Sequence, residues 1–80
     1  MSQPLNLITN KFEELPNNIE AEQSVIGSIL LTNEIFDEVS LIITSKNFYD
    51  PIHKKIFEAL EKLIYSGLLA NPITLKNYFE

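Results

Sequence analysis

The chain has 80 residues, of which 45% are hydrophobic and 21% are charged. This length suffices for one small domain and excludes a complete motor, a doubly wound nucleotide-binding sheet or a TIM barrel, which need roughly 150 to 250 residues. Six lysines and no arginine stand against 11 acidic residues, and the net charge of −5 would repel a phosphate backbone, so we expect no direct nucleic-acid binding.

The cysteine content and the hydropathy pattern indicate a cellular compartment. Cysteine is absent, which excludes a disulfide framework and a thiolate metal site and is typical of intracellular proteins. The longest run of apolar or small residues, Ser24 to Leu31, is far shorter than the roughly 20 residues that cross a bilayer. We therefore expect a cytoplasmic protein that makes no contact with a membrane.

The first segment of the chain, residues 1–16, contains scattered apolar residues between two prolines, and we interpret it as a flexible tail. Residues 17–80 form the expected helical domain. Asn17 followed three residues later by Glu20 has capping-box spacing, and it predicts a first helix that runs to about Leu31.

Two more helices follow in the predicted domain. Thr32 and Asn33 provide a break and a new N-cap, and the second helix has apolar residues at helical spacing: Ile35, Phe36, Val39, Ile42 and Ile43. Asp50 and Pro51 start the third helix as an N-cap and a first-turn proline, and Gly67 ends it. Its predicted central stripe is Ile52, Ile56, Ala59, Leu60 and Leu63, flanked by His53, Phe57 and Ile64.

The fourth helix starts at Asn71 and Pro72, which repeat the cap-plus-proline pattern, and it continues to Tyr78 and Phe79. No glycine or basic last turn ends it, so we expect the chain to be a fragment cut inside an element. The apolar end of that helix predicts weak self-association through residues 72–80. Four helices with short links predict an all-α fold, a small bundle of four helices.

Two polar residues interrupt the apolar face of the first helix. On a helical wheel centred on Ile26, Glu22 and Gln23 fall inside the apolar arc. A buried carboxylate is costly unless it is paired, so we predict that Glu22 bonds to a helix N-terminus or to His53, with catalysis as the less favoured alternative. The same arguments leave both residues the option of a place at the bundle rim.

Three further residues are interaction or structural candidates. Gly27 lies inside a helix, and we weigh two explanations for it equally. Either another helix packs closely against the bare face of the glycine, or the helix simply tolerates the residue. Phe48 and Tyr49 precede the third helix, and we favour anchoring in the core over an exposed aromatic contact for a partner.

Asp50 and His53 have the i,i+3 spacing of carboxylate metal sites, which is the sharpest catalytic signal in the sequence. Asp50 is already the predicted N-cap, and a bundle metal site needs two such motifs where one histidine allows only one. We therefore predict neither a metal site nor a catalytic residue, and we interpret His53 as a structural residue that donates to a neighbouring polar group.

Four ordered blocks of the sequence resemble a known family. They are the run from Leu15 to Leu31, the run Phe36-Asp37-Glu38-Val39, the run Phe48 to His53 with Ile56-Phe57, and Pro72-Ile73-Thr74-Leu75 after a glycine-containing loop. Together they resemble the opening of the replicative hexameric DNA helicases of the DnaB type. The resemblance covers about residues 15–80.

This resemblance implies a parent protein that unwinds duplex DNA at the replication fork with a RecA-like, ATP-driven motor in its C-terminal half. The present chain would be the start of the N-terminal domain, which pairs into a collar on the ring and helps to dock primase. Helicase loader proteins are further candidate partners. The family domain continues past the fourth helix into a helical hairpin that carries much of the pairing surface, and this sequence lacks it.

The sequence predicts that the chain itself is not an enzyme. Its only glycines, Gly27 and Gly67, lie forty residues apart, so no phosphate-binding loop can be formed and no cofactor is expected. ATP and Mg²⁺ are expected only for the absent motor domain. The alternative is an unrelated small acidic adaptor or regulator that shares the four-helix pattern.

Overall fold

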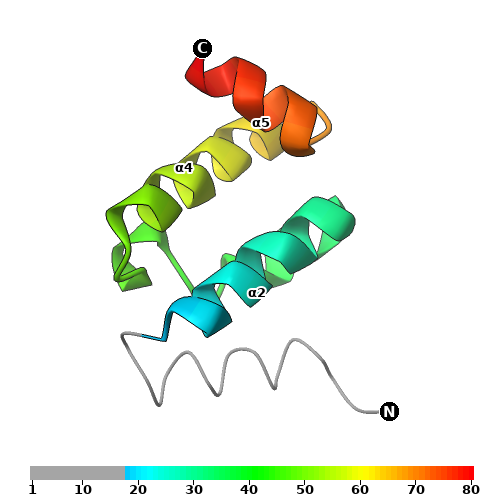
Figure 1. Ribbon diagram of the computed structural model, residues 1–80. Helices are drawn as coiled ribbons and strands as arrows, with labels where there is room; N and C mark the ends of the chain where they lie inside the picture. The colour runs from blue at the N-terminus through cyan, green and yellow to red at the C-terminus, as the bar shows by residue number, and fades with distance from the viewer. Residues whose placement is uncertain (1–17) are drawn as a thin grey trace.

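The computed structural model describes residues 18–80, so the predicted tail and Asn17 lie outside the described residues. Within 18–80 there are four α-helices and no strand, which confirms the predicted all-α fold. The helices are α2 (Ile19–Leu31), α3 (Phe36–Val39), α4 (Pro51–Tyr65) and α5 (Pro72–Phe79) (Figure 1). Two short 3₁₀ helices, η1 (Asn33–Ile35) and η2 (Ser45–Asn47), precede α3 and α4.

The start of α2 differs by one residue from the sequence prediction. The N-cap is Asn18, whose side-chain oxygen accepts a hydrogen bond of 3.0 Å from the Ala21 N–H. Two carboxylates, on Glu20 and Glu22, lie in the first turn, where the helix dipole favours negative charge. The predicted end at Leu31 is confirmed.

The second predicted helix is wrong in length. It divides into η1 and the single-turn α3, and the chain then turns, so that Ile42 is exposed while Ile43 is buried. Ile42, Ile43 and Thr44 are three consecutive β-branched residues, which are weak helix formers, and the turn is what brings Ile43 into the core.

The starts of α4 and α5 and the end of α4 follow the predicted cap chemistry. The prediction that the last turn of α5 has no basic residue is wrong, because Lys76 lies in that turn. Asp50 caps α4, and the Asn71 side chain accepts from the N–H groups of Ile73 and Thr74 at the start of α5. Gly67 has a φ of 80°, which a side chain would resist, and the Leu68 N–H reaches back to the Leu63 carbonyl in a Schellman arrangement.

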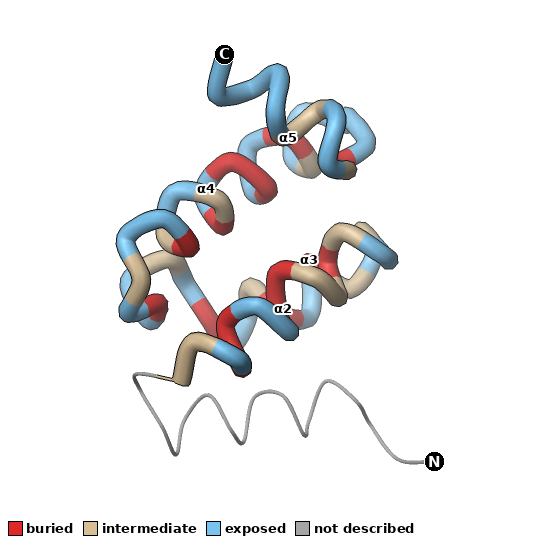
Figure 2. Tube along the Cα trace, viewed as in Figure 1, coloured by how far each residue is buried: buried red, intermediate tan, exposed pale blue. Residues whose placement is uncertain are grey.

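The core lies between α2, α3 and α4, where buried residues face one another (Figure 2). Its aromatic centre is Phe57, with ring centroids 5.3 Å from Phe36 and 5.0 Å from Phe48. On α4 the buried face is rotated from the predicted stripe, because Ile52 is 66% exposed while His53 is buried. By contrast, α5 has no buried residue and packs only its inner side against α4.

Candidate functional site

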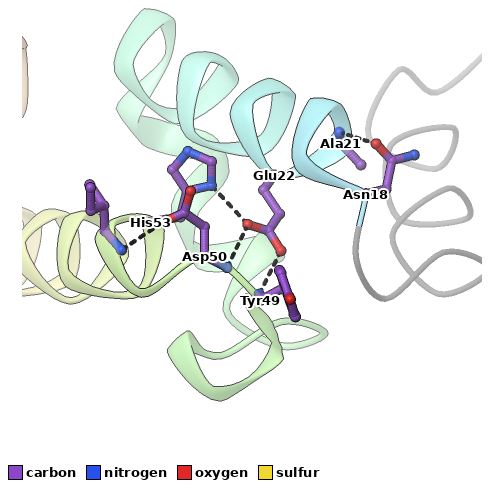
Figure 3. A network of polar contacts seen from close by, with 7 residues as sticks. Asn18, Ala21, Glu22, Tyr49, Asp50 and His53 are labelled. Atoms are coloured by element: carbon purple, nitrogen blue, oxygen red, sulfur yellow. Dashed lines mark hydrogen bonds and ion pairs between the residues drawn. The ribbon is translucent and has the colours of Figure 1, made fainter.

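The α2–α4 junction, formed by Glu22, Tyr49, Asp50 and His53, is the polar centre of the domain. The Glu22 side chain is 1% exposed and extends from α2 toward the start of α4 (Figure 3). Its Oε2 accepts a hydrogen bond of 2.6 Å from the Tyr49 N–H, and its Oε1 accepts a longer one of 3.3 Å from the Asp50 N–H. Glu22 therefore binds two N–H groups that lie before the first turn of α4 and have no partner within that helix.

His53 completes the bonding of the same carboxylate. Its Nδ1 lies 2.8 Å from Glu22 Oε1, and the His53 residue is only 9% exposed. This contact is a hydrogen bond between two side chains that are both buried between α2 and α4. Glu22 bonds both to the start of α4 and to His53, so the two partners predicted for it are confirmed.

The geometry of the junction holds α2 on α4. The Asp50 carboxylate accepts from the Ile52 N–H at 2.8 Å, so the acid of the Asp50 and His53 motif caps its own helix. Across residues 18–80, no group of three or more histidine and acidic side chains is placed to hold a metal ion, and no buried side-chain nitrogen or oxygen lacks a partner. A buried charge satisfied in this way fixes the relative position of two helices.

The other sequence candidates divide between core and surface. Phe48 and Phe57 are each 2% exposed and anchor the core, as predicted. The prediction of core anchoring is wrong for Tyr49, whose ring is exposed while its backbone N–H binds Glu22. Gln23 is also exposed, because the buried face of α2 runs through Ala21, Glu22, Val25, Ile26 and Ile29 and so turns away from it.

The two explanations for Gly27 are decided by the space around it. Among residues 18–80, a Cβ placed there would have no neighbour within 4 Å, so close packing of another of the described elements against Gly27 is wrong. Simple tolerance is the explanation that fits the described residues.

A second surface lies beside α5. An apolar groove of about 470 Å³ is lined by Leu30 of α2 and by residues of α4 and α5: Ile52, Lys55, Ile56, Pro72, Leu75, Lys76 and Phe79. Phe79 is 50% exposed, and Tyr78 beside it is 42% exposed, with their rings edge to face at 5.3 Å. This end of the domain, unlike the junction, presents apolar side chains to the outside.

Asn33 is a structural residue whose role the sequence did not predict. Its amide nitrogen donates to the carbonyls of Ile29 and Ala70, and its oxygen accepts from the Ala70 N–H at 2.8 Å. Asn33 therefore connects the end of α2 to the loop before α5, and Thr32, the other residue of the predicted break and cap, is the N-cap of η1. The sequence marks Asn33 as a breaker, but the contact with Ala70 spans 37 residues and leaves no local signal.

Comparisons with known proteins identify the family. Residues 14–80 match the family described as the DnaB-like helicase N terminal domain. The chain belongs to this family. This finding confirms the sequence resemblance, and it overturns the alternative of an unrelated acidic adaptor.

Individual relatives agree with the family assignment. The chain is 43% identical over 79 residues to a protein of Rickettsia typhi named "Replicative DNA helicase DnaB", a match that covers 91% of this chain and 16% of the relative. Proteins with the same name match in Rickettsia felis, at 48% over 63 residues, and in Buchnera aphidicola, at 39% over 70 residues. These two matches cover 79% and 88% of this chain, and 13% and 15% of the relatives.

Three further findings accompany the family assignment. No solved structure matches the chain significantly. Among residues 18–80, no helix is long and apolar enough to cross a membrane. The chain spans about a sixth of the length of the Rickettsia typhi helicase that it resembles.

Proposed function

We propose that this chain is the N-terminal interaction domain of a replicative DNA helicase, a cytoplasmic ring that unwinds duplex DNA at the fork. The match of residues 14–80 to the helicase N-terminal domain family is the observation that carries the proposal. In this proposal the ATP-driven motor, with its Mg²⁺, belongs to another part of the protein, and the present domain is not catalytic. The short share of each relative that it matches supports this division.

The domain works through protein contacts, by self-association into the collar of a hexamer and by docking primase. The distribution of apolar side chains supports this mode of action. The core between α2 and α4 is closed, yet large apolar residues of α4, α5 and their connecting loop remain open to solvent: Ile52, Tyr65, Leu68, Leu69, Ile73, Tyr78 and Phe79. Such patches mark contact surfaces in soluble proteins. Helicase loaders are further candidates for these surfaces, and the acidic charge argues against direct binding of DNA.

The partner proposal is tested by titrating the 80-residue chain with the primase of Rickettsia typhi, whose replicative DNA helicase is 43% identical to this chain, and measuring binding calorimetrically. We expect saturable binding. Two surface variants distinguish an apolar contact from a charge effect. Ile73→Asp changes the exposed side of α5, and Glu61→Lys changes the polar side of α4. If primase fails to bind both this chain and a longer one that includes the following residues, primase docking is wrong.

The non-catalytic role is tested by measuring phosphate release from ATP with Mg²⁺, in the presence and in the absence of single-stranded DNA. We expect no turnover, because the sequence has no glycine-rich phosphate loop. Turnover that co-purifies with the chain through several different columns would overturn this part of the proposal.

A further inference from the structure

The apolar groove beside α5 is open to solvent and has a defined floor and walls. Leu30, Ile56 and Leu75 are partly buried and pack on the core, so they form a fixed floor. Ile52 and Phe79 are 66% and 50% exposed and also line the groove, so their side chains form its walls. A fixed apolar groove of this kind accepts exposed apolar side chains from another surface.

The charges beside the groove have one sign. Its charged lining residues are Lys55 and Lys76, and among residues 18–80 no acidic residue lines it. Lys55 forms no ion pair with another of the described residues, and Lys76 makes only an exposed contact of 3.9 Å with Glu80. The groove therefore favours an apolar group that has carboxylates beside it.

One exposed surface of the same domain has that composition. It consists of Asp37 and Glu38 of α3 with Leu41 and Ile42 of the turn that follows, and we call it the acidic turn. Both acids are exposed, and Leu41 and Ile42 are 86% and 51% exposed. The N–H groups of Leu41 and Ile42 donate to the carbonyls of Glu38 and Val39, which keeps these apolar side chains close to the two acids. The acidic turn is therefore complementary to the groove in both polarity and charge.

The acidic turn and the groove lie on opposite sides of α4. The Phe36 ring of α3 packs edge to face on Tyr65 of α4, with ring centroids 5.6 Å apart. Tyr65 and the groove residue Ile56 are nine residues apart, which at about 3.6 residues per turn is about two and a half turns of helix. A contact between the two surfaces must therefore join two copies of the chain, with the turn of one copy in the groove of the other.

We propose that the acidic turn of one copy of this chain binds in the groove of a second copy. In this contact Leu41 covers the apolar floor, and Asp37 and Glu38 lie beside Lys55 and Lys76. The inference rests on the self-association in the proposed function and names the two surfaces that make it. Because each added copy brings a further free groove, the contact repeats head to tail and closes into a ring where the rotation between copies permits.

Two variants that each block one surface test this contact. Ile52→Asp places a charge on the wall of the groove, and Leu41→Asp replaces the apolar residue of the turn; both positions are exposed, so the fold should be kept. We expect sedimentation velocity to show association of the unaltered chain that rises with concentration, and each variant to weaken it by about tenfold or more. As the control, Leu31→Asp changes a leucine that is 89% exposed and belongs to neither surface, so it should leave association unchanged.

A mixture of the two blocked chains tests whether the contact is head to tail. The Leu41→Asp chain keeps an open groove, and the Ile52→Asp chain keeps its acidic turn. We expect the mixture to form a one-to-one pair that grows no further. If the mixture stays monomeric, the two surfaces do not bind each other. If the Leu41→Asp chain alone associates as strongly as the unaltered chain, the turn is not the occupant of the groove.

Exchange of the charges tests the ionic part of the contact. Lys55→Glu with Lys76→Glu should weaken association, and adding Asp37→Lys with Glu38→Lys to the same chain should restore it. Thermal melts check that every variant is folded, and where an aspartate variant melts early, Leu41→Ser or Ile52→Ser takes its place. A charge exchange that restores nothing would overturn the proposed pairing.

The same measurements separate this inference from the proposed function. Association that none of the variants changes would overturn the contact between the acidic turn and the groove and leave self-association standing. A chain that stays monomeric at every concentration would overturn both.

Discussion

The two sides of α4 differ in how completely their neighbours surround them. On the side that faces α2, the Glu22 carboxylate, the His53 ring and two backbone N–H groups form a closed network beside buried Phe48. On the side that faces α5, that helix covers α4 without burying a single residue of its own, and the groove between them, which reaches Ile52 in the first turn of α4, is open. The first arrangement fixes the helices, and the second leaves surface available.

This difference indicates where the domain draws its stability and where it makes contacts. Interactions that are fully buried and satisfied are costly to remove, whereas exposed apolar residues contribute little to folding and much to association. Substitutions at the α2–α4 junction should therefore change the free energy of unfolding, and substitutions on α5 should change binding.

A matched pair of aromatic truncations should separate the two sides of α4 most clearly. Phe57→Ala removes the ring that contacts Phe36 and Phe48 and should lower the free energy of unfolding by about 3 to 5 kcal/mol. Phe79→Ala, on the open side of α5, should change it by no more than about 0.5 kcal/mol. Urea denaturation followed by circular dichroism measures both. If Phe57→Ala leaves too little folded protein to measure, Phe57→Leu provides a milder comparison.

Equal losses from the two truncations would contradict the comparison. That result would mean that α5 is as much a part of the cooperative core as α4.

The junction carboxylate should be the next most sensitive position. Glu22→Gln keeps the size of the side chain but directs an NH₂ group at N–H donors that need an acceptor. We therefore expect the free energy of unfolding to fall by about 1 to 3 kcal/mol. Glu20→Gln removes the same charge from the exposed side of the same turn and should cost about 0.5 kcal/mol or less. Thermal melts of both variants provide the measurement, and similar melting temperatures would refute a special role of Glu22.

Much of the fold and one feature of the site could be predicted from the sequence, because the signals are local. Asp50-Pro51, Asn71-Pro72 and Gly67 determine where helices begin and end through the chemistry of their own backbone neighbours. Glu22 could be recognised because a carboxylate within an apolar arc must find a partner. These residues needed no knowledge of distant elements.

The errors arise where distant contacts decide the outcome. Ile52 fits the apolar spacing of α4, but α5 leaves its side uncovered, so it is exposed. Ile42 fits a helical repeat, but the chain turns there to bring Ile43 into the core. The bonds of Asn33 were not predicted because its partner, Ala70, lies 37 residues away in the sequence. Neither spacing nor propensity contains that information.

Asn33 lies between the two parts that we compare, because it bonds both to α2 and to the loop before α5. Asn33→Ala removes three hydrogen bonds that connect α2 to the loop before α5, and it leaves the Ala70 N–H without that partner. We expect the free energy of unfolding to fall by about 1 to 3 kcal/mol. Amide hydrogen exchange should speed up around Ala70 and along α5 more than along α2. Exchange that speeds up equally in both helices would show that α5 does not open separately.

Gly27 provides the smallest and opposite effect. Glycine inside a helix costs about 1 kcal/mol relative to alanine, and a Cβ at this position meets no atom within 4 Å. Gly27→Ala should therefore stabilise the domain by about 0.5 to 1 kcal/mol, which corresponds to several degrees of melting temperature for a domain of this size. Differential scanning calorimetry at low concentration measures this gain, and sedimentation at high concentration measures self-association. We expect any association to be unchanged, because the surfaces that we propose for it, the groove beside α5 and the acidic turn after α3, do not include Gly27. A gain in melting temperature together with loss of association would place Gly27 in a contact between chains, and the division between a stabilising side and a binding side of α4 would then be wrong.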